Sequence, residues 1–359
     1  LGVDVGGTFT DLLLINEESG ETFTAKVPST PEDSSVGVLN GISRICEESG
    51  VAPENINRVM HGTTVATNAV LTARGAKVGL VTTKGYKFVL QVARSFCPGG
   101  LGGWVSFVKK PLLAPLELTI EADERIDAQG NVVGELDESA LLEELKTLKA
   151  RGEVESLTIC FTNAYINGKN ELLAAAVAKQ IFPDIPISIS SEVVPEMQEY
   201  ERAETTVVNA YVRPEVSKYI NNLQAALKKS MGEDIALSIL RSDGGLASGR
   251  ASAESPVNML MSGPAGGVAG AIYFCSRAGY DNILTFDMGG TSTDVALIQN
   301  GKAQVRRETI VADVRVRAPS VDVRTVGAGG GSIAFVPELT RALRVGPQSA
   351  GAVPGPAAY

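Results

Sequence analysis

The chain has 359 residues, of which 44% are hydrophobic and 20% are charged. This length exceeds what one hydrophobic core usually organises, so we expect two domains. The net charge of −9, from 41 acidic and 32 basic residues, argues against a nucleic-acid partner. No apolar run reaches the roughly 18 residues of a transmembrane helix, and the N-terminal residues lack the pattern of a secretory signal.

The four cysteines are far apart in the sequence, and no two of them form a Cys-x-x-Cys pair. His61 is the only histidine, so this chain alone cannot build a histidine-rich metal centre. A disulfide framework or a zinc site would need a different cysteine pattern. We therefore expect free thiols in a reducing, cytoplasmic environment.

The first part of the chain alternates strands and helices. Apolar segments around tight glycine turns predict antiparallel strands between residues 1 and 27. A helix is expected at 31–48, where Thr30 can cap and a proline occupies the first helical position. A second helix at 65–73 and a strand at 77–83 follow.

Residues 95–135 differ in composition from their surroundings. Their first part is rich in glycine and contains Trp104, the only tryptophan. We expect an insertion here, either a substrate lid with Trp104 as an apolar wall or a loop without a chemical role. A Gln-Gly-Asn turn predicts an antiparallel pair of strands near its end.

The middle of the chain again alternates helices and strands. The predicted elements are a helix at 137–150, a strand at 156–162, a helix at 171–181 and a strand at 185–191. This alternation is typical of an α/β layer architecture.

The last part of the chain begins with two polar helices, at 197–212 and 214–230. A strand at 236–245 runs into a glycine turn, and a helix of small residues is expected at 262–279. The segment 282–301 then repeats the strand-turn-strand pattern of the N-terminus.

Two octapeptides are nearly identical: DVGGTFTD at 4–11 and DMGGTSTD at 287–294. Each copy lies between apolar strands, so each is predicted to form a β-hairpin with a glycine tip. Glycine lets the backbone approach a ligand closely, and consecutive N–H groups at such a tip can form an anion-binding nest. Two hairpins that face each other across a cleft would hold both ends of a polyphosphate, whereas the alternative is an inert duplicated hairpin.

The hairpin interpretation selects specific residues. Asp4 and Asp287 end their strands, where a carboxylate could hold Mg²⁺ directly or through water. Asp11 and His61 are further catalytic candidates, although a lone histidine is also compatible with a structural role. The expected contacts to the nucleotide are Gly6, Gly7, Thr8, Thr10, Gly289, Gly290, Thr291, Thr293, Gly329 and Gly330.

Other phosphate-binding motifs are missing from the sequence. There is no GxxxxGK[ST] segment, which excludes a P-loop. GAGGGS at 327–332 neither completes GxGxxG nor opens a βαβ unit, so a dinucleotide site is a weak interpretation. Its glycine density alone suggests a second anion nest.

Several segments resemble a known family. The two octapeptides resemble the phosphate motifs of the actin, sugar-kinase and heat-shock-chaperone ATPase superfamily, and SGPAGGVAGA resembles its connecting helix. HGTTVATNAVL, SDGGLAS, MSGPAGG and TVGAGGGSIAF are similar, more specifically, to the hydantoinase A/5-oxoprolinase family. The resemblance covers nearly the whole chain and is poorest at residues 95–115.

The resemblance implies an α/β fold of duplicated ribonuclease-H-like, actin-like lobes. It implies a first lobe at 1–195, with an inserted subdomain around 95–135, and an incomplete second lobe at 196–359. The second lobe would contain the connecting helix at 262–279 and the second phosphate hairpin at 282–301. Because the chain starts at Leu1 without a methionine and ends at Tyr359 inside a Gly/Pro/Ala-rich stretch, we expect both termini to be incomplete. Family members are also longer, and their adenosine motif is not found here.

The resemblance also implies a reaction. The family uses ATP, with Mg²⁺, to phosphorylate a lactam or cyclic imide and drive its ring-opening hydrolysis. The first alternative is the ATPase subunit of an acetone- or acetophenone-type ketone carboxylase, and the second is a non-enzymatic nucleotide-binding module. The expected partners are a small-molecule substrate and either a hydantoinase B-like subunit or a missing C-terminal half, without nucleic acid or membrane.

Some positions depart from the family pattern or are ambiguous. Asn163 and Asn170 stand where the family has histidines in a segment resembling HSYxNPxHE, and Asp243 stands where it tends to show asparagine. Arg94 could face an anionic substrate group or lie on the surface. The charged residues at 200–202 are expected to form a solvated helix face with local ion pairs.

Overall fold

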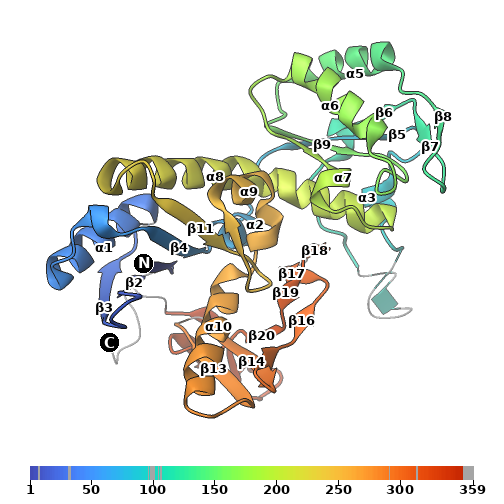
Figure 1. The fold of residues 1–359 in the computed structure, drawn as a ribbon. Helices are drawn as coiled ribbons and strands as arrows, with labels where there is room; N and C mark the ends of the chain where they lie inside the picture. The colour runs from blue at the N-terminus through green and yellow to red at the C-terminus, as the bar shows by residue number, and fades with distance from the viewer. Residues whose placement is uncertain are drawn as a thin grey trace.

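The structure is a computed structural model with three units, the first two of which share one long helix (Figure 1). It describes residues 1–6, 9–30, 34–95, 97, 102–103, 105, 107–290, 292–312 and 314–350. Within these residues no helix has both the length and the apolar character needed to cross a membrane. None of the four cysteines forms a disulfide, as predicted.

The first unit is a mixed sheet in the order β12-β11-β4-β1-β2-β3. Its strands are β1 (Gly2–Val5), β2 (Phe9–Ile15), β3 (Thr22–Pro28), β4 (Arg58–Thr63), β11 (Ala236–Leu240) and β12 (Leu246–Ser248). β1, β2 and β3 form the predicted antiparallel meander, whereas β4 runs parallel to β1 and β11 parallel to β4. Strands β11 and β12, which come from far along the sequence, thus extend the sheet at its edge beside β4.

Helices cover one face of this sheet. They are α1 (Ser34–Ser49), α2 (Val65–Leu71), α8 (Glu199–Met231) and α9 (Gly249–Glu254). Side chains alternate along the strands: Val3 and Leu12 are buried against the helices, while Asp4 and Asp11 are exposed on the other face. This period of two fixes which residues can reach a ligand.

The second unit is a parallel sheet in the order β10-β9-β5-β6 with its own hydrophobic core. Its elements are β5 (Val78–Thr83), α3 (Val89–Val92), β6 (Thr119–Ala122), β7 (Arg125–Ile126), β8 (Val132–Gly134), α5 (Glu138–Ala150), β9 (Ser156–Cys160), α6 (Lys169–Ile181), β10 (Ile187–Ile189) and α7 (Ser190–Val193). Every residue of β5 and β9 is buried, as expected for a parallel sheet that is covered on both faces.

The third unit is an antiparallel sheet that packs against α10 (Ser262–Arg277). Its strands are β13 (Ile283–Met288), β14 (Thr293–Gln299), β15 (Lys302–Ala303) and β20 (Val323–Val326). Three two-stranded ribbons accompany it: β16 (Val305–Arg306) with β19 (Ser320–Val321), β17 (Thr309–Val311) with β18 (Val314–Val316), and β21 (Ser332–Phe335) with β22 (Arg344–Ser349).

Three sequence expectations need correction. The boundary at residue 195 does not separate the units, because β11 pairs with β4 of the first sheet; the third unit begins with α10. The insertion is larger than 95–135, because β5, β9 and β10 join β6 in the second sheet. Only β7 and β8 form the expected antiparallel pair.

The two helices predicted around Pro214 are one continuous helix, α8. Proline inside a helix costs about 3 kcal/mol, since it removes one hydrogen bond and crowds the preceding turn. Residues 205–212, just before it, are buried on all sides, because α8 packs between the first sheet, α2 and β9 (Figure 1). Burial of this stretch outweighs the local penalty, which sequence periodicity alone could not reveal.

The start of α8 is fixed to the second unit by a buried ion network. Arg202, expected on a solvated face, is completely buried. Its guanidinium donates to Ser190 Oγ at 2.6 Å and to the carbonyl of Phe161, and it also contacts Glu199. Glu171, equally buried, lies 3.7 Å from it and accepts from two backbone N–H groups. The network thus joins α8 to the carboxyl ends of β9 and β10.

We predict that Arg202→Leu lowers the free energy of unfolding by about 3–5 kcal/mol, because it leaves the Glu171 carboxylate buried without its cation. Urea denaturation monitored by circular dichroism measures this change. Lys169→Leu, which removes an exposed partner of Glu135, serves as the control and should change stability by at most about 1 kcal/mol. Equal effects of the two substitutions would contradict the assigned role of the network.

Candidate functional site

The two octapeptides form hairpins of identical register. Asp4 pairs with Asp11 across the first hairpin, and Asp287 pairs with Asp294 across the second. The turns close in the same way: Gly6 N–H donates to the carbonyl of Phe9 at 3.0 Å, and Gly289 N–H donates to that of Ser292 at 2.9 Å. The sequence repeat is therefore a structural repeat. Gly7, Thr8 and Thr291 lie outside the described residues.

The repeat extends to the third strand of each hairpin unit. In the first unit Asp11 pairs with Lys26 of β3, and their side chains form an ion pair of 3.0 Å. In the second unit Asp294 occupies the same position and accepts a hydrogen bond of 2.5 Å from Thr325 of β20. The sequence analysis did not identify Lys26 as a site residue. Pairing the predicted strands across the turn at residues 18–21 would have placed it opposite Asp11.

The first carboxylates of the two hairpins interact electrostatically. Asp4 is accessible to solvent, but the protein around it displaces water, and this raises the pKa of its carboxyl above the ordinary value. The negative charges of Asp11 and Asp287 raise the pKa further. The contribution of Asp287, from a different unit of the chain, means that the two hairpins share one electrostatic environment.

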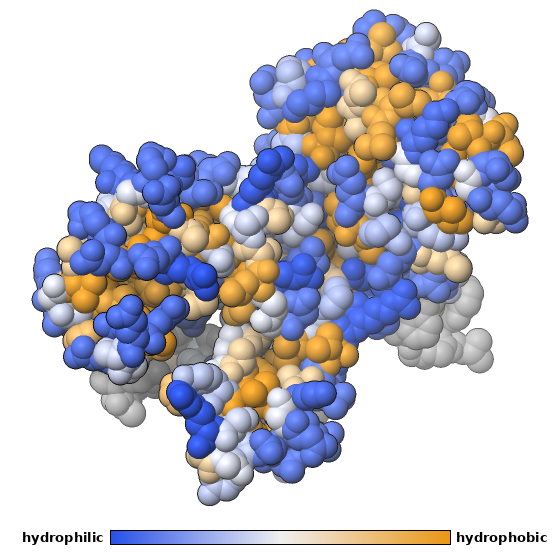
Figure 2. Space-filling view, in the orientation of Figure 1, coloured by the Kyte–Doolittle hydropathy of each residue, from blue (hydrophilic) through white to orange (hydrophobic). Residues whose placement is uncertain are grey.

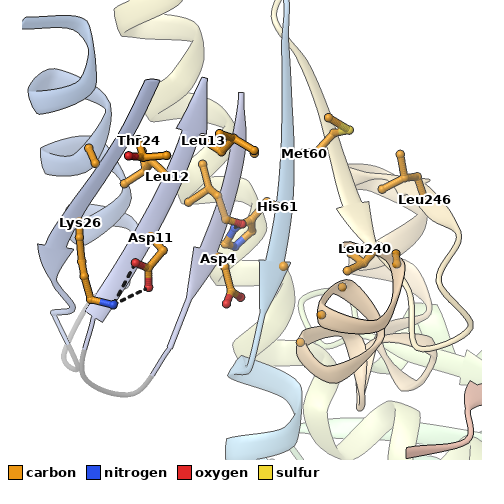
Figure 3. A pocket seen from close by; sticks show the side chains of 18 of the residues that line it. Asp4, Asp11, Leu12, Leu13, Thr24, Lys26, Met60, His61, Leu240 and Leu246 are labelled. Atoms are coloured by element: carbon orange, nitrogen blue, oxygen red, sulfur yellow. Dashed lines mark hydrogen bonds and ion pairs between the residues drawn. The ribbon is translucent and has the colours of Figure 1, made fainter. Parts of the chain in front are cut away.

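A cleft of about 1070 Å³ opens along the exposed face of the first sheet. Asp4, Asp11 and Lys26 lie side by side on this face (Figure 3). The opposite wall is α10, whose Gly263, Gly266 and Gly267 border the cleft. Most of the remaining lining is apolar: Leu13, Met60, Leu240, Leu246 and Phe274.

Helix α10 connects the two hairpin units. It packs on β4 and β11 of the first sheet and on β13 and β14 of the third unit. Its first residue, Ser262, donates its hydroxyl proton to the carbonyl of Thr63 at 2.8 Å. A Cβ at Gly266 would lie 2.8 Å from a methyl group of Leu240, so glycine allows this close packing. The predicted small-residue helix is confirmed and spans the two sheets.

Thr10 and Thr293 were predicted to contact the ligand, but the structure turns both side chains toward the protein. Each is almost completely buried, because each lies one position away from an exposed aspartate on its strand. The Thr10 hydroxyl bonds Ser29, which in turn donates to the carbonyl of Gly6 at 2.8 Å. Thr293 donates to the carbonyl of Ala328 at 2.6 Å. Both threonines therefore brace the turns from behind.

The segment 327–332 packs directly on the second glycine turn. Gly330 N–H donates to the carbonyl of Gly289 at 2.9 Å, and Gly331 N–H donates to that of Gly290 at 2.7 Å. The N–H of Gly329 donates to Ser332 Oγ at 2.8 Å. These three donors are used within the protein, so the predicted anion nest at Gly329 and Gly330 is replaced by a buttress that shapes the turn.

His61 borders the cleft, but its ring is engaged in contacts within the protein. Its ring is buried: Nδ1 lies 3.3 Å from the carbonyl oxygen of Val3, and Nε2 lies 2.7 Å from the hydroxyl of Tyr219 on α8. Burial lowers the pKa of His61 to about 4, so the ring is neutral at physiological pH. The structure assigns it a packing role between β1 and α8.

The other ambiguous residues also make structural contacts. Asn163 and Asn170 donate to the carbonyl of Ile126 and to Glu124, both at 2.9 Å, within the second unit. Arg94 forms two hydrogen bonds of 2.7 Å with Glu201. Trp104 lies outside the described residues, so its proposed place in a lid stays a prediction.

A metal ion would have to be held by few protein ligands. Among the described residues no group of three or more His, Cys, Asp or Glu side chains is arranged to bind one. Two carboxylates that repel each other nevertheless fit a hard cation that completes its shell with phosphate oxygens and water, which is the usual environment of protein-bound Mg²⁺. The raised pKa of Asp4 is the observation that favours such a cation.

Comparison with known proteins identifies the family. Models of the hydantoinase/oxoprolinase N-terminal region and of hydantoinase/oxoprolinase match residues 1–182 and 202–359. The chain belongs to the hydantoinase/oxoprolinase family. The alpha subunit of caprolactamase from Pseudomonas jessenii is 35% identical over 100% of this chain and 52% of its own length.

Solved structures of family members have the same fold. The ATP-dependent caprolactamase from Pseudomonas jessenii matches with a TM-score of 0.85 and 34% identity, over 100% of this chain and 52% of that chain. A nucleotide-free acetone carboxylase, from a study of ATP-dependent acetone carboxylation, matches with a TM-score of 0.84 and 28% identity. This match covers 98% of this chain and 51% of that chain. The mixed α/β fold is therefore that of these two enzymes, and the chain spans about half the length of the relatives it matches.

We predict that Gly329→Ala lowers the free energy of unfolding by about 1–3 kcal/mol, as overpacking typically does. The added Cβ would lie 2.5 Å from the carbonyl oxygen of Gly289 and 2.7 Å from a backbone atom of Gly290, so the turn must move. Gly330→Ala is the matched control, since its Cβ would meet nothing closer than 3.8 Å. Urea denaturation of both variants tests the buttress, and equal stabilities would refute it.

The burial of the neutral His61 ring predicts a specific pH dependence of the free energy of unfolding. Its pKa is lowered to about 4 in the folded protein, so between pH 6.5 and 4 the unfolded chain binds a proton that the folded chain does not. Stability is therefore lost as the pH falls through this window. His61→Gln should remove about 2–3 kcal/mol of this acid-induced loss, as measured by urea denaturation at pH 7 and pH 4.5. A variant with the wild-type pH profile would contradict the buried neutral state.

Proposed function

We propose that the chain binds ATP between its two glycine turns and uses it to activate a cyclic amide for ring-opening hydrolysis. One observation carries this proposal: two hairpins of identical register bring Asp4 and Asp287, from separate units, into one electrostatic environment. Glycine turns that lie near paired carboxylates suit a polyphosphate with its cation. An inert duplication would not need the acidic residues to converge.

The duplicated hairpins also support an actin-like interpretation of the fold. On this proposal the first sheet with α1, α2 and α8 is the core of one lobe, and the third unit is part of the second. Helix α10, which packs on both sheets, is the connecting helix between them. The parallel second unit is a subdomain inserted into the first lobe after α2.

Asp4 and Asp287 are the residues that would hold Mg²⁺, together with phosphate oxygens and water. When bound, the cation neutralises charge on the transferring phosphoryl group. Asp11 is less suited to this role because Lys26 already pairs with it. The glycine turns contribute by positioning the triphosphate, and the threonines and the 327–332 segment keep them in shape.

The proposed chemistry is a phosphoryl transfer to the amide oxygen of the ring. The oxygen attacks the γ-phosphorus of ATP, and the bond to the bridging oxygen breaks with its electrons leaving on ADP. The O-phosphorylated amide carbon is a better electrophile, so water adds to it and the C–N bond breaks, with its electron pair and a proton going to the ring nitrogen. A second water hydrolyses the resulting acyl phosphate to the carboxylate and inorganic phosphate. Positioning and charge neutralisation supply most of the catalysis in such transfers.

We place the cyclic amide first because the caprolactamase subunit is 35% identical to this chain, compared with 32% for the acetophenone carboxylase gamma subunit and 28% for the acetone carboxylase structure. The likeness to acetone carboxylase supports the second candidate, in which the oxygen of a ketone enolate accepts the phosphoryl group. A nucleotide-binding module without catalysis is the third. An ATPase assay with lactams, and with ketones plus bicarbonate, separates them: stimulation by lactams supports the first, whereas binding without stimulated turnover supports the third.

Exposed apolar side chains on the third unit support the proposal that further polypeptide completes the active site. Strand β13 forms an edge of the sheet, and its Leu284, Phe286 and Met288 are between 56% and 67% exposed. Figure 2 shows apolar surface on this unit. These three side chains alternate along β13 and therefore share one of its faces, and an exposed apolar patch of this kind marks an interaction surface. The polypeptide that covers this patch would come from a partner subunit or from sequence corresponding to the second half of the relatives.

We predict that Asp4→Asn and Asp287→Asn each reduce ATP turnover at least about 100-fold, because each removes charge that holds the cation at the transferring phosphoryl group. Turnover is measured with the completed complex in a coupled ADP-release assay, and circular dichroism checks the fold. Asp184→Asn, an exposed substitution in the second unit, is the control and should keep wild-type turnover. Full activity of either Asp4→Asn or Asp287→Asn would sink the proposed role.

A further inference from the structure

The second hairpin unit contains an insertion that the first unit lacks. In the first unit the third strand, β3, pairs with β2 continuously from Phe9 to Ile15. In the second unit the same position beside β14 is filled by two separate pieces, β15 and β20. Residues 304–322 leave the sheet after β15 and return to it at β20. They therefore interrupt the strand that braces the second glycine turn.

The inserted residues form a ribbon that reaches across to the first unit. At its root, β16 pairs with β19, and the N–H of Val321 donates to the carbonyl of Ser242 at 2.8 Å. At its tip, β17 pairs with β18 and packs on α8 and α2. Val311, Val316 and Ala318 are buried in the same hydrophobic core as the first sheet. The tip thus belongs to the core of the first unit, whereas the root continues into β20 of the third unit.

Polar contacts fix the ribbon to the start of α8. Arg307 forms an ion pair of 2.6 Å with Glu196, and the side chain of Arg317 donates to Gln198. The backbone N–H of Arg317 donates to the buried Thr205 hydroxyl at 2.8 Å. Gln198 has a φ of 91°, a strained conformation for a residue with a side chain, and such strain persists where surrounding contacts impose it.

We propose that residues 304–322 are a strap that sets the position of the second glycine turn relative to the first, with Glu196, Thr205 and Arg307 as positioning residues. The proposal rests on the nucleotide site described above. The root of the strap continues into β20, which pairs with Thr293 and Asp294 beside the turn. Its tip is held by α8, and α8 packs on α1 behind the first hairpin. A displacement of the tip of the strap would therefore also displace the second glycine turn.

The same few residues of α8 also hold the second unit. Arg202, which anchors α8 to β9 and β10, lies three positions before Thr205, which anchors the strap. The strap, the first unit and the second unit therefore meet at one end of one helix.

The test uses charge reversal and rescue in the full chain. Arg307→Glu should weaken ATP binding about threefold, because an exposed ion pair contributes up to about 1 kcal/mol. The double variant Glu196→Arg/Arg307→Glu should restore the wild-type dissociation constant. Adding Thr205→Val to Arg307→Glu should weaken binding about tenfold, since a buried N–H then loses its acceptor. Arg250→Glu, which reverses an exposed arginine paired with Glu254, is the control.

Two readouts separate positioning from simple stability. Calorimetric titration with MgATP gives affinity, and turnover at saturating ATP should stay unchanged, so that KM rises while kcat does not. Hydrogen exchange without nucleotide should be faster in Arg307→Glu at residues 283–296, and the charge swap should slow it again. Unchanged affinity and exchange in Arg307→Glu, or failure of the swap to rescue either, overturns the strap. If the wild-type chain binds no ATP, the proposed function fails, and hydrogen exchange still decides whether the strap holds the turn.

Discussion

The crowding of negative charge around the partly desolvated Asp4 is the constraint on which the proposed site depends. Burial is the main cause of the raised pKa of the Asp4 carboxyl, and the charges of Asp11 and of Asp287 from another unit add to it, so ionised Asp4 is unfavourable unless a cation stabilises it. The surrounding protein holds these carboxylates there with matching hairpins, with a glycine-lined helix between the sheets and with a ribbon that ties the third unit to α8. On the proposed function, this concentration of carboxylates is where the polyphosphate binds together with its cation.

The two glycine turns are supported in related but unequal ways. The first turn is braced by Ser29 and Thr10 from its own three-stranded meander. The second is braced by Thr293 and by the 327–332 segment, which closes over Gly289 and Gly290. The second turn also depends on a strand that is interrupted by the strap. Movement between the units would therefore be expected mainly at the second turn.

Sequence reasoning located the hairpins and the connecting helix, because a repeated octapeptide and a run of small residues are local signals. It assigned Thr10 to the ligand, although strand alternation from the exposed Asp11 already places that side chain in the core. The continuity of α8 through Pro214 and the buried position of Arg202 depend on contacts between distant segments. No local pattern reports such contacts, so these features became visible only in the structure.

The most direct test of this account is a crystal structure of the chain with a non-hydrolysable ATP analogue and Mn²⁺, whose anomalous signal locates the cation. The account predicts a manganese peak between Asp4 and Asp287, coordinated directly or through one water, with phosphate groups against both glycine turns. Nucleotide bound elsewhere, or manganese away from both carboxylates, would contradict it.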